Sequence, residues 1–332
     1  MPKALVVGCN GQDGYYLVQQ LETKGYLVAG IDRDVAKELP GGRGIDIRDA
    51  SAVRYVIENL APDEVYFLAA FHHSADDPGL DEGELVLRSF EINTLALNHV
   101  LSAIAATSRH SRLFYAASSH IFGDPPTDVQ DENTPLNPVD PYGISKTAGV
   151  HLCRYYRTQR QLFCSVGILY NHESPRRHGA FVSQKVVQAA VRISHQAQDK
   201  LVVGNLDAMV DWGYAPDYVD AMWRILQLPE PDDFVIASGS LHSVRDLVQT
   251  AFEAVGLDWN AYVETNPGVT KKRYGNRLQG NSARLEAQTG WRPSMPFAEM
   301  IQAMVQAEDA KWNLTESSPP ERQHCGTGAY RN

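Results

Sequence analysis

A glycine-rich loop directly after the first apolar segment constrains the fold of this chain more than any other feature. Residues 3–7 have the sequence Lys-Ala-Leu-Val-Val, and glycines follow at positions 8, 11 and 14. In a strand–loop–helix unit, Gly8 permits a tight turn, Gly11 lets the backbone approach a pyrophosphate, and Gly14 allows close packing of helix on sheet. The phosphates then lie on the N–H groups at the helix start. The pattern therefore predicts a dinucleotide-binding βα unit.

Short β-rich segments alternate with amphipathic segments through the first half of the chain. We expect strands over residues 4–7, 27–31, 64–68, 113–116 and 164–169, and helices over residues 15–24, 50–59, 85–106 and 143–158. Alternation at this spacing is typical of parallel strands whose sheet is covered by helices on both faces. The sequence predicts an α/β fold with a Rossmann-type, doubly wound parallel sheet.

The second half is less regular and predicts a smaller C-terminal α/β lobe. Helices are expected over residues 182–193, 216–227, 243–255 and 297–307. A chain of 332 residues is long enough for a large domain with a smaller one attached. We expect an NAD(P)-binding domain at 1–170 and a lobe at 171–320 that mainly binds substrate, with some segments returning to the Rossmann core. Residues 321–332 are polar with two glycines, which predicts a flexible tail.

Residues in the glycine loop and at the strand ends are the candidate cofactor ligands. Asp32, at the end of the second expected strand, can hydrogen-bond the adenosine ribose and repel a 2′-phosphate, which favours NAD. Arg33 could instead pair with a 2′-phosphate, so NADP is the alternative. Residues 46–47 are expected to flank the adenine, and residues 68–70 to lie beside the cofactor. The candidate cofactor-binding residues are Gly8, Asn10, Gly11, Gln12, Asp13, Gly14, Asp32, Arg33, Asp46, Ile47, Leu68, Ala69, Ala70, Tyr142 and Lys146.

Tyr142 and Lys146 form a Tyr-x-x-x-Lys pattern, which places both side chains on one face of a helix. An ammonium group beside a phenol lowers the pKa of the phenol, and it can also hold the nicotinamide ribose. Tyr142 can then act as base or acid in hydride transfer between nicotinamide and a hydroxyl or carbonyl carbon. Ser118, at the end of the preceding strand, would orient the substrate oxygen. Asn93 fits a structural polar role in the same site, or that of an ordinary residue on a helix face.

Charge and cysteine spacing exclude several other classes of function. The net charge is −10 and no run of Lys or Arg occurs, which argues against nucleic acid or an anionic membrane as partner. No apolar stretch reaches membrane-spanning length and the N-terminus lacks a signal-peptide pattern, so we expect a cytoplasmic protein. The four cysteines show neither a Cys-x-x-Cys pair nor zinc-type spacing, which predicts reduced thiols, at least two of them buried, and no metal site. Cys9 is expected to be a small apolar filler within the loop.

Five longer motifs carry a resemblance to a known family. They are GCNGQDGYYL at 8–17, NHESPRRHGAFVSQK at 171–185, GNLDAMVDWGYAPDYVDAMW at 204–223, DDFVIASGSLHSVRDLV at 232–248 and GNSARLEAQTGWRP at 280–293. In this order they resemble one branch of the extended short-chain dehydrogenases, the GDP-mannose 4,6-dehydratases, over almost the whole chain. The resemblance implies oxidation at C4 of a nucleotide-linked hexose, with Tyr142 as base, followed by loss of water from C5 and C6 and return of hydride to C6.

The same resemblance implies the substrate and its ligands. It implies a nucleotide-sugar substrate, with a GDP-hexose favoured, and a homodimer or homotetramer. The candidate substrate-binding residues are His72, Ser119, Asn171, Lys185 and Arg273. His72 and the adjacent His73 could position substrate or simply line the loop.

One departure from the family pattern affects the chemistry. Where the family has a glutamate two residues after the active-site Ser or Thr, this chain has His120. Imidazole can accept a proton and imidazolium can return one, so His120 is the candidate second acid/base. The alternative is that His120 packs or contacts substrate without transferring a proton.

A second departure affects phosphate binding. Where the family has an arginine before Asp-Trp-Gly, this chain has Val210. Losing a charge-assisted contact would weaken phosphate binding by about 1–3 kcal/mol. Either another cation compensates or the substrate differs in its phosphate portion. The candidate cations are Arg176, Arg177, Lys185 and Arg273.

Three functional hypotheses follow from these patterns. The leading one is an NAD(P)-dependent nucleotide-sugar enzyme of the dehydratase type. A 4-epimerase, 4-dehydrogenase or 4-keto reductase that acts without dehydration is the first alternative, because His120 replaces the glutamate. A catalytically silent, nucleotide-binding regulatory protein is the second.

Overall fold

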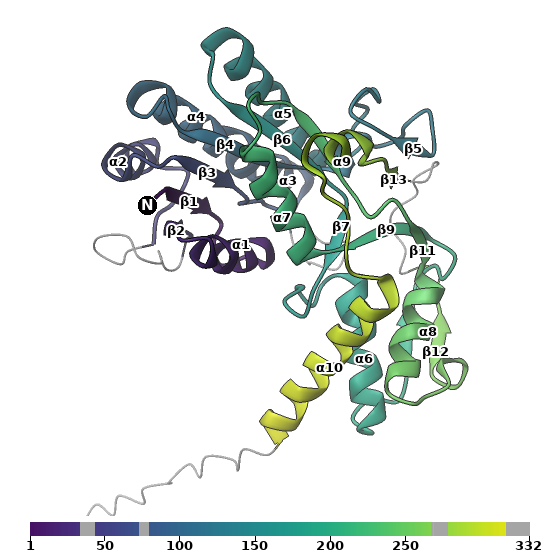
Figure 1. Ribbon diagram of the computed structural model, residues 1–332. Helices are drawn as coiled ribbons and strands as arrows, with labels where there is room; N and C mark the ends of the chain where they lie inside the picture. Colours follow the sequence, from purple (N-terminus) through teal and green to yellow (C-terminus); the bar gives the residue numbers. More distant parts are fainter. Residues whose placement is uncertain (34–43, 73–79, 267, 269–277, 317–332) are drawn as a thin grey trace, which may run out of the picture.

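The computed structural model describes residues 1–33, 44–72, 80–266, 268 and 278–316, and its main element is a six-stranded sheet. All neighbouring strands in this sheet are parallel. Their order is β10 (Asp233–Ile236), β6 (Cys164–Leu169), β4 (Arg112–Ser118), β3 (Glu64–Phe67), β1 (Lys3–Val7) and β2 (Leu27–Ile31) (Figure 1). The predicted α/β fold with a Rossmann-type parallel sheet is confirmed.

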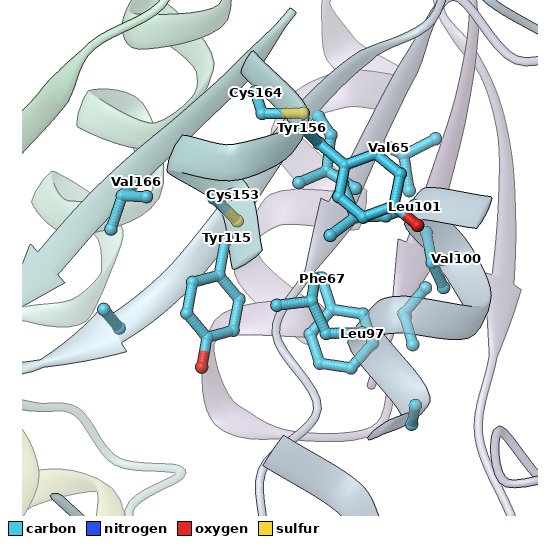
Figure 2. Close-up of a cluster of buried hydrophobic side chains, with 14 of the residues drawn as sticks. Val65, Phe67, Leu97, Val100, Leu101, Tyr115, Cys153, Tyr156, Cys164 and Val166 are labelled. Atoms are coloured by element: carbon cyan, nitrogen blue, oxygen red, sulfur yellow. The ribbon is translucent and has the colours of Figure 1, made fainter. Parts of the chain in front are cut away.

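Helices cover both faces of this sheet because successive side chains of each strand point to opposite faces. In β1, Leu5 and Val7 belong to one core, and Ala4 and Val6 belong to the other. The first core is closed by α2 (Ala50–Leu60), α4 (Ala96–Thr107) and α5 (Pro141–Arg160), and the second by α1 (Gln12–Thr23) and α7 (Ala215–Leu226). Figure 2 shows part of the first core, in which Tyr115 of β4 is fully buried.

The segment predicted as one helix over residues 85–106 changes helix type along its length. It begins as α3 (Glu82–Phe90), continues as a π-helical turn over Glu91–Leu95, and ends as α4. Asp81 caps α3, because its carboxylate accepts a hydrogen bond from the N–H of Glu84 at 2.8 Å. Single π-helical turns are frequent at functional sites. This one contains Asn93, which contacts the candidate site described below.

After residue 170 the chain builds a second, smaller group of elements. These are the sheet of β11 (Leu241–Ser243), β9 (Met209–Tyr214) and β7 (Asn171–Glu173), the pair β12 (Val263–Thr265) and β8 (Leu201–Val203), and the helices α6 (Val182–Ser194), α8 (Val244–Ala254) and α10 (Phe297–Glu316). The three helices enclose a separate apolar core and lie apart from the large sheet in Figure 1. Helices predicted over 182–193, 216–227 and 243–255 are confirmed with ends shifted by at most one residue, whereas α10 runs well past its predicted end.

Other segments after residue 170 return to the large sheet. Helix α7 covers one face, β10 forms the edge next to β6, and α9 (Ala283–Thr289) packs against both. A further pair of short strands, β5 (Val129–Gln130) and β13 (Gln279–Gly280), joins the two halves of the chain. Elements of the smaller group and elements that pack on the large sheet are therefore interleaved in the second half of the sequence.

The cysteines lie in the cores, as far as the structure describes them. Cys9, Cys153 and Cys164 are buried thiols, which confirms the prediction that at least two are buried. Cys9 is 5% exposed and packs among apolar side chains, as expected of a filler. Cys325 and the predicted tail at 321–332 lie outside the described residues. None of the described helices combines the length and apolar character that crossing a membrane requires.

Candidate functional site

The glycine loop forms a turn that only glycine fits at two positions. Gly8 has a φ of +92°, and a Cβ atom placed there would lie 2.8 Å from the backbone nitrogen of Ala69. A Cβ on Gly14 would lie 2.3 Å from the carbonyl oxygen of Gly8. Gly11 is the N-cap of α1 and offers no side chain to the N–H groups of the first turn. These donors and this close approach fit the pyrophosphate of a dinucleotide.

Asp32 lies at the carboxyl end of β2, next to this loop. Its carboxylate accepts hydrogen bonds from the backbone N–H of Asn10 at 3.2 Å and of Arg33 at 2.7 Å. Its carbonyl accepts from the N–H of Ile45 at 3.0 Å, which brings Ile47, 8% exposed, toward the same edge. The geometry fits the predicted adenosine side of a dinucleotide site.

Asp46 and the residues after β3 also lie at this edge. Asp46 forms an ion pair of 2.6 Å with Arg48, whose hydrogen bond lowers the pKa of Asp46. Leu68 and Ala69 both donate their N–H groups to the carbonyl of Val7 at 2.9 Å. β3 ends at Phe67, one residue before the predicted end, so residues 68–70 form the turn beside Gly8.

Gln12 and Asp13, predicted as cofactor ligands, contact β7 and the residue that follows it through their side chains. The Gln12 amide donates to the carbonyl of His172 at 3.0 Å and accepts from the hydroxyl of Ser174 at 2.8 Å. Asp13 pairs with the His172 imidazole at 2.9 Å. Burial alone would raise the pKa of Asp13, but the charge and hydrogen bond of His172 outweigh it and lower that pKa. Sequence reasoning missed His172, although it lies in the quoted motif at 171–185.

Tyr142 and Lys146 lie in the first two turns of α5, and Ser118 ends β4 beside them. The Lys146 ammonium donates to the carbonyl of Ala116 at 2.8 Å and lies 5.8 Å from the centre of the Tyr142 ring. The predicted lowering of the phenol pKa by Lys146 is wrong for this structure. Burial raises the pKa of Tyr142 to about 12, against smaller lowering effects of a Ser118 hydrogen bond and the Arg177 charge. Burial also lowers the pKa of Lys146 to about 7, which weakens Lys146 as a source of positive charge.

Three rings meet at the start of α5. The ring centre of Tyr142 lies 4.8 Å from that of His72 and 5.4 Å from that of His120, with near-perpendicular planes. His120 Nδ1 lies 3.0 Å from a carboxylate oxygen of Asp140, the N-cap residue of α5. Ser119, beside His120, is 4% exposed. The sequence already put Tyr142 and Ser118 in one site and brought His72 and His120 forward separately, and in the structure the rings of His72, His120 and Tyr142 lie together.

Asn93 has the structural role that the sequence left open. Its amide exchanges two hydrogen bonds with the backbone of Phe71, at 2.8 and 3.1 Å, and donates to Ser145 at 3.0 Å. Asn93 is fully buried. It therefore ties the segment that precedes His72 to helix α5.

The remaining substrate candidates lie on β7 and α6. Asn171 is exposed at the start of β7, where it pairs with Trp212 of β9. The backbone of Lys185 donates to the carbonyl of Phe181, whose ring packs 5.3 Å from His72. The start of α6 therefore reaches the ring cluster. Arg273 and His73 lie outside the described residues.

Comparison with known proteins places this fold and site in a family. A family model described as GDP-mannose 4,6 dehydratase matches residues 5–304. GDP-mannose 4,6 dehydratase 2 of Arabidopsis thaliana is 36% identical over an alignment of 323 residues that covers 91% of this chain and 85% of that protein. The chain belongs to the GDP-mannose 4,6-dehydratase family.

Solved structures share the fold of this dehydratase-family chain at low sequence identity. RMD from Pseudomonas aeruginosa, complexed with NADPH, matches with a TM-score of 0.80 at 20% identity, over 94% of this chain and 100% of that one. UDP-glucose 4-epimerase of Thermus thermophilus, in complex with NAD, matches with a TM-score of 0.76 at 24% identity, over 92% and 98%. As a member of the GDP-mannose 4,6-dehydratase family, the chain is an NAD(P)-dependent nucleotide-sugar enzyme.

The structure shows what faces Val210, where the family resemblance implies an arginine. In the register of β9 and β11, Val210 is opposite His242. The His242 ring stacks on Phe297 with centres 3.9 Å apart, and burial lowers the pKa of His242. This neighbour therefore supplies no positive charge at neutral pH. The adjacent Asp211 is structural, because it accepts hydrogen bonds from the backbone N–H groups of residues 238, 239 and 280.

The two arginines of the motif at 171–185 make different contacts. Arg177 lies 3.1 Å from the Glu173 carboxylate, and its guanidinium lies 3.6 Å from the ring centre of Phe181. Arg176 is exposed, with its guanidinium 3.8 Å from the ring centre of Tyr15 at the start of α1. Arg177 is thus paired with Glu173, whereas Arg176 is exposed near the glycine loop.

Proposed function

We propose that this enzyme oxidises C4 of a nucleotide-linked hexose and then eliminates water from C5 and C6, with GDP-mannose or a related GDP-hexose as substrate. The observation that carries the proposal is the convergence of Tyr142, Ser118 and His120 at the carboxyl end of β4. A phenol and an imidazole at one site can serve two different proton transfers. Membership of the GDP-mannose 4,6-dehydratase family supports the same reaction.

Tyr142 takes the proton of the C4 hydroxyl in the first step, and Ser118 orients the oxygen. The nicotinamide, when bound, supplies a site that accepts hydride from C4 and returns it to C6, and its positive ring favours an ionised phenol. With a pKa raised to about 12 by burial, Tyr142 otherwise holds its proton at neutral pH. Lys146, buried beside the ring, holds the ribose of the cofactor by hydrogen bonding.

His120 performs the two proton transfers of the elimination, from C5 and to the departing C6 hydroxyl. Two protons leave the sugar, one from the C4 hydroxyl to Tyr142 and one from C5 to His120. Two are returned, one to the departing C6 hydroxyl and one to C5, so the chain ends in its starting protonation state. Since imidazole both accepts and donates near neutral pH, His120 can replace a carboxylate in this role.

NAD is the proposed cofactor, bound mainly by residues 1–170. The support is Asp32, whose carboxylate lies at the end of β2 beside Asn10, where a 2′-phosphate would be repelled. Arg33 is exposed next to it, so NADP remains the competing cofactor. We propose that the sugar and its diphosphate lie between this part and the elements after residue 171, on Asn171, Lys185 and Arg176.

We also propose that the enzyme is a homodimer or homotetramer. Helices α3 and α5 contact each other and carry exposed apolar side chains, among them Leu87 at 58% and Tyr155 at 50% exposure. Burial of such side chains between copies removes apolar surface from water. Size-exclusion chromatography with light scattering measures the mass, and a monomer at micromolar concentration would contradict this proposal.

A reaction confined to C4, as epimerisation or ketone reduction, is the alternative that the exchange of glutamate for His120 favours. To separate the two, pure enzyme is incubated with NAD or NADP and with GDP-mannose or related GDP-sugars, and products are analysed by mass spectrometry. We expect a product lighter by one water. A product of unchanged mass would establish the alternative. No product and no transient nicotinamide reduction with any nucleotide sugar would favour a catalytically silent protein.

A further inference from the structure

The carboxylate of Asp140 serves two partners at once. One oxygen accepts the N–H of Gly143 at 2.7 Å, which caps helix α5. The other oxygen lies 3.0 Å from Nδ1 of His120. An ionised carboxylate only accepts hydrogen bonds, so Nδ1 must carry the hydrogen of this contact. In a neutral imidazole the other nitrogen, Nε2, is then the one that accepts a proton.

The backbone fixes both partners of this contact. Helix α5 begins so close to His120 that a Cβ atom on Gly143 would lie 2.5 Å from the His120 carbonyl oxygen. Pro141 follows Asp140 in the first turn, and the carbonyl of Asp140 accepts from the N–H of Ile144 at 2.9 Å. The N–H of His120 donates to the Ser118 hydroxyl at 3.3 Å. The imidazole and the carboxylate are therefore held facing each other before substrate arrives.

We propose that Asp140 is a positioning residue that keeps His120 in the tautomer whose Nε2 accepts the C5 proton. The His120 and Asp140 side chains are 19% and 26% exposed, so the pair borders the site and is open to a substrate. The inference rests on the proposed function, because it assigns a partner to the acid/base residue of that reaction. The imidazole and carboxylate together replace the single carboxylate that the family resemblance implies at position 120.

The pair completes the proton balance of the elimination. His120 Nε2 takes the proton as the C5–H bond breaks. The electron pair of that C5–H bond forms the C5–C6 double bond as the C6–O bond breaks. The imidazolium returns that proton to the departing hydroxyl, which leaves as water. Asp140 remains ionised throughout and stabilises the imidazolium by its charge.

Nitrogen NMR of the ¹⁵N-labelled enzyme tests the tautomer without relying on activity. The His120 signals are assigned by their loss in His120→Gln, and spectra are compared where the ring is neutral. We expect the hydrogen on Nδ1 in the wild type. In Asp140→Asn, the amide oxygen keeps the cap and the NH₂ group faces Nδ1, so the hydrogen should move to Nε2. A wild-type hydrogen on Nε2, or an unchanged tautomer in the variant, would overturn the proposal.

Single-turnover kinetics test the consequence for the reaction. In Asp140→Asn we expect the rate of water loss to fall about 100-fold, while C4 oxidation, followed as nicotinamide reduction, changes less than about threefold. Asp81→Asn is the matched control, because Asp81 caps α3 by the same type of bond. It should leave both rates unchanged. Equal losses in both steps of Asp140→Asn would show a merely structural role. If the wild type forms no dehydrated product, the proposed function fails, and the NMR result still decides the pairing.

Discussion

Nε2 of His172 lies 2.9 Å from the Asp13 carboxylate, and this buried pair joins the glycine loop to β7. The other ring nitrogen, Nδ1, lies 2.7 Å from the carbonyl oxygen of Tyr170. Both nitrogens therefore face acceptors, which favours an imidazolium. Burial alone would lower the pKa of His172, but the charge and hydrogen bond of Asp13, with the hydrogen bond to Tyr170, together outweigh it and raise that pKa. The pair links the glycine loop, which fits a dinucleotide, to the part of the chain that we propose binds the sugar.

This pair predicts how stability depends on pH. The pKa of Asp13 is lowered, so its contribution is complete above about pH 4 and is lost as the pH falls through that lowered value. The pKa of His172 is raised, so its contribution is complete below about pH 6.5 and is lost as the pH rises through that raised value. Asp13→Asn should therefore cost about 3 kcal/mol between these limits and less on either side. Denaturant unfolding of both proteins across this range measures the difference.

An exposed pair of the same type is the control. His195 and Asp309 lie 2.7 Å apart, with side chains 32% and 42% exposed. Asp309→Asn should cost less than about 1 kcal/mol at any pH, because solvent screens the pair. A penalty for Asp13→Asn that is equally small, or that does not change with pH, would contradict the assignment of a buried ion pair.

Two glycines with similar φ values allow the effect of backbone strain to be measured apart from the effect of close packing against a neighbouring backbone. Gly8 and Gly25 have φ values of +92° and +81°, but a Cβ on Gly25 meets nothing within 4 Å. Gly25→Ala should cost about 1 kcal/mol and leave dinucleotide affinity unchanged. Gly8→Ala carries the same strain and also forces the turn away from Ala69, so it should be the more destabilising and should weaken NAD binding at least about tenfold. Calorimetric titration with NAD and thermal unfolding measure both effects. Equal behaviour of the two variants would contradict the close approach.

Local sequence patterns predicted the parts of the site that are built from residues close to one another in the sequence. The glycine spacing predicted the turn at Gly8 and Gly14, because a strand, a tight turn and a helix start follow each other in the chain. The four-residue spacing placed Tyr142 and Lys146 on one helix face for the same reason. Five strands of the sheet were predicted to within two residues at each end.

Contacts between distant segments could not be predicted in this way. Asp140 reaches His120 only because α5 begins against the turn after β4, and His172 reaches Asp13 across 159 residues of chain. Some segments after residue 171 were expected to return to the Rossmann core, but the spacing did not predict that β10 would form the edge of the large sheet. The pKa of Tyr142 was predicted to be lowered but is raised. Burial, which a spacing pattern does not reveal, outweighs the nearby charges.

Lys146 predicts a second dependence of stability on pH. Burial lowers its pKa to about 7, against about 10.4 in an unfolded chain. Between these values the unfolded state binds the proton and the folded state does not, so this contribution to stability grows as the pH rises from about 7 to about 10. The unfolding free energy of the wild type relative to Lys146→Met should therefore increase over this range in the absence of dinucleotide. Other titrating groups are common to both proteins and cancel. A constant difference would show that Lys146 is not desolvated.

Asp32 predicts the choice of cofactor. The wild type should bind NAD more tightly than NADP, because the Asp32 carboxylate repels a 2′-phosphate. Asp32→Ser should weaken NAD binding and improve NADP binding, so the ratio of the two Kd values should change at least about tenfold. Glu22→Gln, an exposed change in α1, serves as the control for net charge. Tighter binding of NADP by the wild type would assign the dominant role to Arg33 instead.

Solvent deuterium at C5 of the product tests the central claim most directly. Enzyme and GDP-mannose are incubated in deuterated water, and the product is analysed by NMR for the wild type and for His120→Gln. If the enzyme oxidises C4 and then eliminates water through His120, the wild-type product carries deuterium at C5 and lacks the C6 hydroxyl. His120→Gln should then form no such product while it still reduces nicotinamide. A wild-type product with hydrogen at C5 and an intact C6 hydroxyl would contradict the account.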